Sequence, residues 1–220
     1  MGFPKELEEA RKRIIYGEEE TMGSWSAAED AALDAILSTI VGEASPAVAK
    51  IYKDPANKKA IIDVIREVKK ETRQEFLGPY ARGSELTAVE IRPQDVLRGG
   101  TALTTWLSSV SAGVAWFESG AGNAAIECPE HEGRAYIGFV DVVDTPRVVA
   151  IQLEKGGDPQ IPVAMDFEKC SEYPVIQLPT PWKITPRDRY RIQVRYHSPG
   201  NDSLRPLGLR IATAATLISL

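Results

Sequence analysis

The chain changes character at Phe76-Leu77-Gly78-Pro79, residues 76–79. Before this stretch the sequence reads as charged amphipathic helix, and after it short β-branched and aromatic runs are separated by proline and glycine. Twelve of the 15 prolines lie at or beyond Pro79. Because proline is excluded from helix interiors but suits turns and strand edges, the pattern predicts a helical arm or subdomain over residues 1–78 and a β domain over residues 79–220.

Several helices are expected in the first part. A narrow apolar stripe predicts one near residues 3–17, and Ser26 with Glu29 forms a capping box before a second helix over residues 31–41. The strongest stripe consists of Ala60, Ile61, Val64, Ile65 and Val68. Such modest apolar faces need a partner, which is either the β domain or another copy of the chain. Under the second alternative Ile61, Ile65 and Val68 are candidate assembly contacts.

Eight or nine short strands are expected in the second part, with no helix-length pattern between them. Residues 190–197 show the clearest alternation, with Tyr190, Ile192, Val194 and Tyr196 on one face and polar side chains on the other. Turn residues at short intervals favour an antiparallel β-sandwich of jelly-roll type over a parallel sheet. The predicted fold class is therefore α+β.

Two further segments bear on assembly. Residues 178–186 hold three prolines around Trp182, so this segment must be extended, and Trp182 lies either in the sandwich core or at a contact with a neighbouring subunit. Residues 207–220 carry Arg210 as their only charge and predict a final strand, paired inside the sheet or against another chain. Leu217 and Leu220 are the candidate contacts there.

The charge pattern limits the partners. The net charge is −5, and the basic clusters 11–13 and 69–70 are flanked by glutamates, so no basic arm for nucleic acid is predicted. No apolar run reaches the roughly 20 residues of a membrane span, and the charged amino terminus does not look like a signal peptide. A cytoplasmic protein is expected unless the chain resides in a virion or other assembled particle. Cys128 and Cys170 are either bridged or two buried thiols.

Residues that could carry chemistry do not form a readable site. Cys128 and His131 are spaced like one half of a zinc site, but the other possible ligands, Cys170 and His197, lie far downstream and do not form a second close pair. A catalytic serine–histidine pair is also not expected, because the adjacent residues His197 and Ser198 point to opposite faces of a strand. Asp141 with Asp144, or Glu127, Glu130 and Glu132, could bind a hard cation, but solvated loop acids explain them better. We therefore expect no catalytic, cofactor-binding or metal site.

The layout of helical arm, compact sandwich and apolar chain end resembles viral coat or capsid proteins with a jelly-roll subunit. In such proteins an arm outside the sandwich ties neighbouring subunits together. The resemblance covers mainly residues 84–220 and lies in the layout, so it transfers no functional residues. It departs from many coat proteins because a basic amino-terminal arm is missing, which argues against direct genome binding.

Three functions are compatible with the sequence. The favoured hypothesis is a structural protein that assembles with itself and is not an enzyme, most simply a capsid or coat subunit. The alternative is a β-sandwich binding module that presents Trp106, Trp116 or Trp182 to a carbohydrate or peptide. The third is an enzyme of unrecognised type, which would need titratable groups with shifted pKa values in one pocket.

Overall fold

The computed structural model describes residues 25–143, 146–164 and 175–218. Three helices come first, followed by fourteen strands, three short 3₁₀ turns (η1–η3) and a short carboxy-terminal helix among the described residues. The helices are α2 (Ala27–Glu43), α3 (Pro46–Tyr52), α4 (Pro55–Thr72) and α5 (Ala214–Ile218). The longer strands are β1 (Leu86–Glu90), β5 (Gly113–Glu118), β7 (Gly133–Asp141), β8 (Val148–Lys155), β11 (Val175–Ile184), β12 (Arg189–Tyr196) and β14 (Leu204–Thr213). The short strands are β2 (Leu97–Arg98), β3 (Thr101–Ala102), β4 (Ser108–Val110), β6 (Ile126–Glu127), β9 (Asp158–Pro159), β10 (Val163–Ala164) and β13 (Gly200–Asp202).

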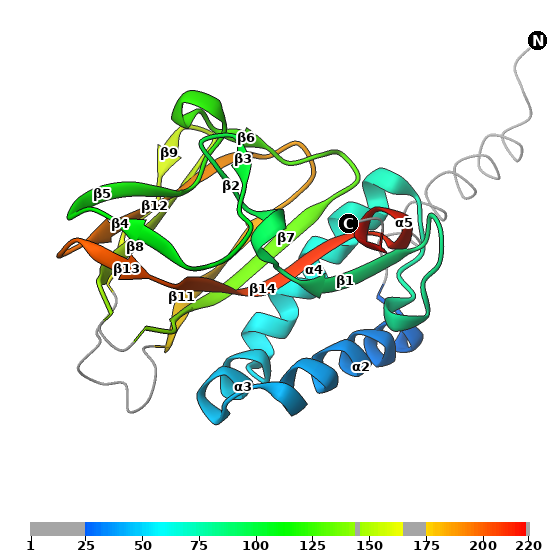
Figure 1. The fold of residues 1–220 in the computed structure, drawn as a ribbon. Coiled ribbons are helices and arrows are strands. Elements are labelled where there is room, and N and C mark those ends of the chain that lie inside the picture. The colour runs from blue at the N-terminus through cyan, green and yellow to red at the C-terminus, as the bar shows by residue number, and fades with distance from the viewer. Residues whose placement is uncertain (1–24, 144–145, 165–174, 219–220) are drawn as a thin grey trace, which may run out of the picture.

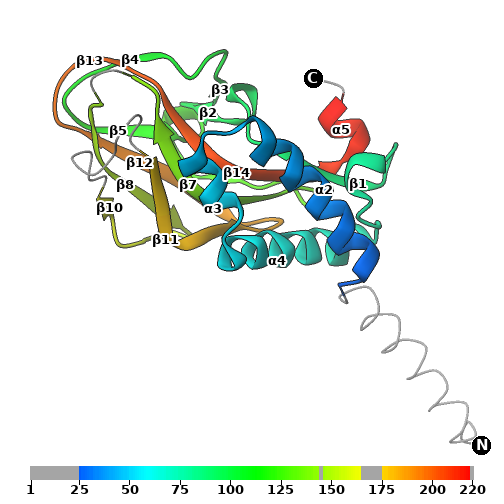
Figure 2. The same cartoon turned by 90° about the horizontal axis from the view of Figure 1, so that it is seen from below.

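Two antiparallel sheets form a sandwich-like arrangement, with helices on one side. We call the sheet β1-β14-β7-β11 the inner sheet and the sheet β10-β8-β12-β5 the outer sheet. Helices α2, α3 and α4 lie on the far side of the inner sheet, away from the outer sheet (Figures 1 and 2). The predicted α+β class with an antiparallel sandwich is confirmed.

The helices begin where the sequence signals predict. The Ser26 hydroxyl accepts from the Glu29 amide at 3.2 Å, and the Glu29 carboxylate accepts from the Ser26 amide at 3.0 Å, which completes the capping box of α2. Ser45 and Asp54 cap α3 and α4, each followed by a proline in the first turn. A buried ion pair between Lys69 and Glu29 joins α4 to α2.

Two separate apolar cores follow from this layering. One core lies between the helices and the inner sheet and includes Ile61, Ile65 and Val68 of α4 with Leu209 and Ile211 of β14. The other lies between the two sheets and includes Trp182, Ile192 and Val194. The helical stripes are thus covered by the chain's own β domain, the first of the two alternatives that the sequence left open.

Strand β7 belongs to both cores, and all nine of its residues are buried. Its register slips at one place: Gly138 pairs with Leu207, but Tyr136 pairs with Gly208, so Ile137 is an extra residue. The opposite neighbour, β11, is irregular at the same level, between Gln177 and Trp182. This is the proline-rich stretch of residues 178–186, and its prolines have no amide hydrogen to donate to a continuous ladder.

Tyr52 of α3 binds the main chain at this irregularity. The Gly208 amide donates to the Tyr52 hydroxyl oxygen at 2.9 Å, and that hydroxyl lies 3.3 Å from the Glu90 carboxylate and 3.4 Å from the Gly208 carbonyl. A side chain at position 208 is excluded, because a Cβ there would lie 1.9 Å from the Ala135 carbonyl oxygen. One buried tyrosine therefore fixes α3 to the bulge in the inner sheet.

The carboxy-terminal segment differs from its prediction. The last strand ends at Thr213, and residues 214–218 form α5 instead of continuing the ladder. The Ala214 and Ala215 amides donate to the carbonyls of Glu85 and Gly83, which precede the first residue of β1, so the strand has no further β1 residue to pair with. Leu217 is buried all the same.

We predict that Tyr52→Phe destabilises the protein by about 1–3 kcal/mol, because the buried Gly208 amide loses its acceptor. Urea unfolding followed by circular dichroism measures this. The matched control is Tyr80→Phe, since Tyr80 is 75% exposed, and we expect it to change stability by less than about 0.5 kcal/mol. Equal effects of the two substitutions would contradict the assigned role of Tyr52.

Candidate functional site

Three places in the described structure gather polar or exposed groups. A charged network lies between the sheets at the start of β7, and a pair of carboxyl groups lies at the end of the same strand. The third place is the uncovered face of the outer sheet.

The charged network depends on a bulge in β5. Trp116 pairs with Gln193, but the next pair is Glu118 with Ile192, so Phe117 is the extra residue. Because of this extra residue, Phe117 and Glu118 both point into the sandwich, whereas regular alternation would send one of them outward. Glu118 is thereby fully buried.

Two arginines meet Glu118 and its neighbours from the inner sheet. Arg134 of β7 and Arg210 of β14 are directly opposite each other across the strands and share the face toward the outer sheet. Like charges in this position repel, so they need carboxylates. Arg134 forms an ion pair with Glu118, and Arg210 forms ion pairs with Glu132 and with Asp95, the latter at 2.6 Å.

Two tyrosines complete the shell of Glu118. The Tyr136 hydroxyl donates to one carboxylate oxygen at 2.6 Å, and the Tyr190 hydroxyl donates to the other at 2.9 Å. Burial raises the pKa of both phenols well above its usual value, so they stay protonated as donors. The buried arginines and carboxylates of this network therefore neutralise one another.

Cys128 lies at the edge of this network and is not an activated nucleophile. Its thiol is buried, donates to the Glu132 carbonyl at 3.4 Å, and has its pKa raised to about 12, mainly by burial. A thiol with this pKa stays protonated at neutral pH. Cys170 lies outside the described residues, so the two alternatives for these cysteines, a disulfide bridge or two buried thiols, both stay predictions.

We predict that Glu118→Gln costs about 3–5 kcal/mol of unfolding free energy, because Arg134 is left buried without its counter-charge. The control is Asp63→Asn, which breaks the partly exposed pair with Lys183 and should cost less than about 1 kcal/mol. Urea denaturation of both variants measures the difference. A loss at Glu118 no larger than that at Asp63 would show that Arg134 is compensated elsewhere.

The carboxyl pair consists of Asp141, the last residue of β7, and Asp202, the last residue of β13. Asp141 pairs with Leu204 in the ladder, which makes Asp202 its diagonal neighbour on the face that holds Leu204. Both side chains are fully buried, and none of their four carboxylate oxygens has a hydrogen-bond partner. Such a pair cannot keep two unshielded charges in a dry interior.

Burial, and after it the adjacent Asp141, raise the pKa of Asp202 to about 7 against the weaker opposing effects of the Leu204 amide and Arg98. Burial also raises the pKa of Asp141, although the Asp202 side chain and the nearby amides of Ser203, Arg147 and Val143 act in the opposite direction. The pair therefore binds a proton near neutral pH that unfolded aspartates release near pH 4.

Stability should fall as pH rises from about 4 to about 7, because only the folded state keeps this proton in that window. The slope reaches about 1.4 kcal/mol per pH unit and levels off above the folded pKa. Asp202→Asn removes this decline, with Asp63→Asn as the control that keeps it. Urea unfolding between pH 4 and 8 in buffers with EDTA measures it; an unchanged pH dependence in Asp202→Asn would refute the assignment.

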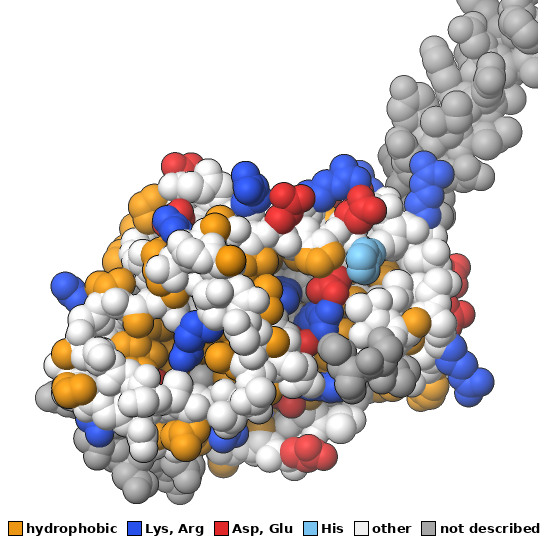
Figure 3. Space-filling view, turned by 45° about the horizontal axis from the view of Figure 1, so that its top comes forward, with side chains coloured by type: hydrophobic (Ala, Val, Ile, Leu, Met, Phe, Trp, Pro, Cys, Tyr) orange, Lys and Arg blue, Asp and Glu red, His pale blue; other side chains and the backbone are white. Residues whose placement is uncertain are grey.

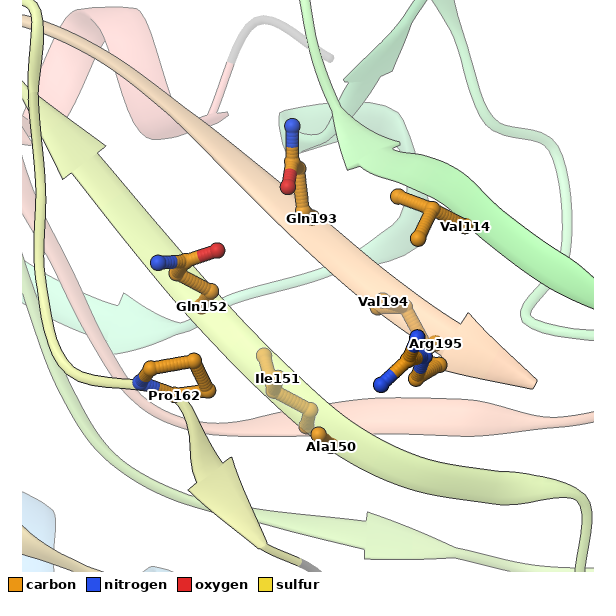
Figure 4. A pocket seen from close by; sticks show the side chains of 8 residues that line it. All are labelled: Val114, Ala150, Ile151, Gln152, Pro162, Gln193, Val194 and Arg195. Carbon is orange, nitrogen blue, oxygen red and sulfur yellow. The ribbon is translucent and has the colours of Figure 1, made fainter. Parts of the chain in front are cut away.

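The uncovered face of the outer sheet carries a shallow hollow (Figure 4). Register places Gln152 beside Gln193, and Arg195 between Ala150 and Val114, all on the face away from the core. Pro162, ahead of β10, closes one side of the hollow. Val114 is 62% exposed and Ile161, next to Pro162, is 87% exposed, so this face combines exposed apolar groups with the polar side chains of Gln152, Gln193 and Arg195.

The three tryptophans proposed as ligand platforms lie in different settings. Trp182 is buried and packs edge-on against Phe139. Trp106 is half-buried and stacks on Phe117. Trp116 lies on the outward face beside Gln193, but the Arg191 guanidinium covers its ring at 4.3 Å from the centroid.

The residues proposed as assembly contacts are mostly internal. Ile61, Ile65, Val68 and Leu217 are buried under the helices or beside them, and Trp182 is buried between the sheets. In this conformation these five side chains contact their own chain and offer no surface to a neighbour. Leu220 lies outside the described residues.

The remaining sequence candidates do not converge. His131 and His197 are exposed, and a His197 ring nitrogen lies 3.1 Å from the Pro146 carbonyl. Glu132 pairs with Arg210, whereas Glu127 and Glu130 are exposed, and Asp144 lies outside the described residues. Within the described part of the chain, no three His, Cys, Asp or Glu side chains cluster for a metal. No helix in that part is long and apolar enough to cross a bilayer.

Sequence reasoning missed the charged network and the partner of Asp141. With regular alternation Glu118 would point outward into solvent, as a glutamate usually does. It points inward because of the bulge in β5, and the sequence gives no clear signal for that bulge. Asp202 follows a Pro-Gly-Asn turn, where an aspartate is ordinary. The single charge of residues 207–220, Arg210, was a usable signal, because a lone arginine in a buried strand requires a carboxylate partner.

Comparisons with known proteins do not identify a family. No family model matches the chain, and no curated protein matches it. Among solved structures, dimeric latent PorU from Porphyromonas gingivalis is similar at a TM-score of 0.22 and 16% identity, over 64% of this chain and 14% of that one. At this level the likeness carries no conclusion about fold or function.

Proposed function

We propose that this chain is a structural subunit that assembles with copies of itself, as the coat or capsid protein of a virus or virus-like particle. The observation that carries the proposal is the uncovered face of the outer sheet with its exposed apolar side chains. The other three sheet faces are covered: two face each other across the sandwich, and the helices cover the third.

The composition of this face suits a protein contact. Val114 is well exposed and lines the hollow together with two glutamines and Arg195, and the exposed Ile161 is next to the lining residue Pro162. Apolar groups surrounded by polar ones are typical of protein interfaces, and arginine is enriched there. The occupant we infer is a second copy of the chain, because a closed shell needs contacts that every copy can make.

The use of the polar residues also supports a structural role. Glu118, Arg134, Glu132, Arg210 and Asp95 pair with one another in the interior and hold the sheets together. The Cys128 thiol is buried and protonated. These groups contribute to the stability of the subunit and are sequestered from any substrate.

Nucleic acid is not the partner that the charge distribution favours. On the face shown in Figure 3, acidic and basic side chains are interspersed, and acidic groups lie beside the histidine. The chain as a whole carries a charge of −5. A phosphate-binding surface needs clustered lysine and arginine, so we propose self-association as the main interaction and a particle as its location.

We predict that Val114→Arg disrupts assembly, because a charge would be buried at the contact, whereas Tyr80→Lys does not. Tyr80 is the matched control because it is also exposed but lies on η1 (Gly78–Tyr80), away from this sheet. Light scattering coupled to size exclusion, followed by electron microscopy, measures the particle mass and shape. Wild type and Tyr80→Lys should give large closed or filamentous species, and Val114→Arg smaller ones.

Moderate salt should leave the assembly intact, because apolar burial drives it and charge screening does not weaken that term. A wild-type protein that stays monomeric at high concentration would refute the proposal. Large particles that persist in Val114→Arg would refute the proposed contact and leave the assembly itself standing.

A carbohydrate- or peptide-binding module is the second candidate. The observation that favours it is Trp116 beside Gln193 on the open face, since an aromatic ring next to amide groups suits sugar recognition. Against it, Arg191 already covers the Trp116 ring. A monomer whose tryptophan fluorescence changes with an added oligosaccharide, and does not change in Gln193→Ala, would favour this module.

A further inference from the structure

The geometry points to a binding site for one calcium ion between Asp141 and Asp202, at the end of the sandwich where β7 and β13 finish. The inference is independent of the proposed self-assembly. It rests on the two carboxyl groups, their burial and the lack of partners for their oxygens.

The side chains of Asp141 and Asp202 lie on the same face of the sheet and are equally buried. Asp141 is opposite Leu204 in the ladder, and Asp202 lies two residues before Leu204, so both carboxyl groups point toward the space between the sheets. Leu204 itself belongs to the core between the sheets. The exposed fraction of Asp141 and of Asp202 is 0%.

All four carboxylate oxygens are buried without a hydrogen-bond partner. This distinguishes the pair from Glu118, whose oxygens bind Arg134, Tyr136 and Tyr190. The oxygens of Glu118 thus have hydrogen-bond partners, whereas the oxygens of Asp141 and Asp202 have none. Buried carboxylates that lack donors are the groups that a cation compensates.

The arginines near the pair do not bind its carboxylate oxygens. Arg98, on β2, lowers the pKa of Asp202, but no oxygen of the pair accepts a hydrogen bond from it. Tyr196 of β12 is buried nearby, and the amides of Ser203, Arg147 and Val143 approach Asp141 without a hydrogen bond of good geometry. The Arg98 Nε is itself buried without a partner, and the Arg147 guanidinium donates to the Asn201 carbonyl and the Ser198 hydroxyl, so neither arginine pairs with the two carboxyl groups.

The donor set fits a hard cation. Both ligands are carboxylates, and the nearby His197 is exposed and turned to the Pro146 carbonyl, so zinc is disfavoured. Two aspartates supply up to four oxygens, and main-chain carbonyls would have to supply the rest of the six to eight that calcium takes. Calcium is favoured over magnesium because magnesium dehydrates reluctantly and this site is closed to solvent.

An ion here would join two parts of the chain that are far apart in sequence. Asp141 precedes the connection from β7 to β8, and Asp202 links β13 to β14. Binding to the folded state alone raises its stability in proportion to the logarithm of the ion concentration. Calcium would therefore act as a clamp at the end of the sandwich opposite the Arg134 network.

The test uses the full chain, freed of metal with a chelator and dialysed at pH 8. Calcium bound per chain is measured by equilibrium dialysis with elemental analysis, and thermal unfolding is followed at rising CaCl₂ and, separately, MgCl₂. We expect one calcium ion per chain and a rise in Tm of about 5–10 °C when calcium reaches a hundred times its Kd. Magnesium should give a smaller rise.

Asp202→Asn and Asp141→Asn should each lose the bound calcium and the rise in Tm, whereas Asp63→Asn, on the surface of α4, should keep both. Wild-type protein that binds no calcium at millimolar concentration would overturn the proposal and leave a proton-sharing pair. Calcium binding that survives in both Asp141→Asn and Asp202→Asn would overturn it too. Because stoichiometry is measured on wild type, a variant that fails to fold does not spoil the test.

Discussion

Strand β7 is the constraint on which the rest of the structure depends, because it must serve two cores at once. Ala135 and Ile137 face the helices, whereas Tyr136 and Phe139 face the outer sheet. The extra residue at Ile137 changes the alternation halfway along the strand and keeps large apolar groups on both faces. The same bulge brings the Gly208 amide to the Tyr52 hydroxyl. The helices are thus held by apolar burial and by a hydrogen bond made where the ladder is irregular.

The two ends of β7 carry buried charges of opposite sign, and the chain handles them differently. Arg134 near the start has a carboxylate and two tyrosines around that carboxylate within the same core. Asp141 at the end has a second aspartate beside it, and its carboxylate oxygens accept no hydrogen bond of good geometry. The two residues are seven positions apart along the strand, about 23 Å, so one cannot compensate the other. The first end is a completed network that fixes how the sheets pack, and the second needs a proton or an ion.

Local patterns predicted the local structure well. The capping box at Ser26, the stripe of α4 and the alternation from Tyr190 to Tyr196 each depend on neighbouring residues, and the structure confirms all three. Features that depend on register were not predictable. The burial of Glu118 follows from a bulge in β5, and the meeting of Asp141 with Asp202 follows from the pairing of β7 with β14. The final strand that residues 207–220 predict ends at Thr213, because β1 provides no further partner.

The packing of the helices shows which surface their apolar stripes cover. A stripe such as Ile61, Ile65 and Val68 looks the same in sequence whether it covers the chain's own sheet or a neighbour's. In the structure Gly133 of β7 lies so close to α4 that a Cβ there would be 2.6 Å from Val64 and 2.8 Å from Val68. That contact leaves no room for another chain between the helix and the sheet. Any assembly therefore has to use surfaces outside this core. Among the faces of the two described sheets, the open face of the outer sheet is not covered by helices or by the other sheet, and it exposes the apolar side chain of Val114.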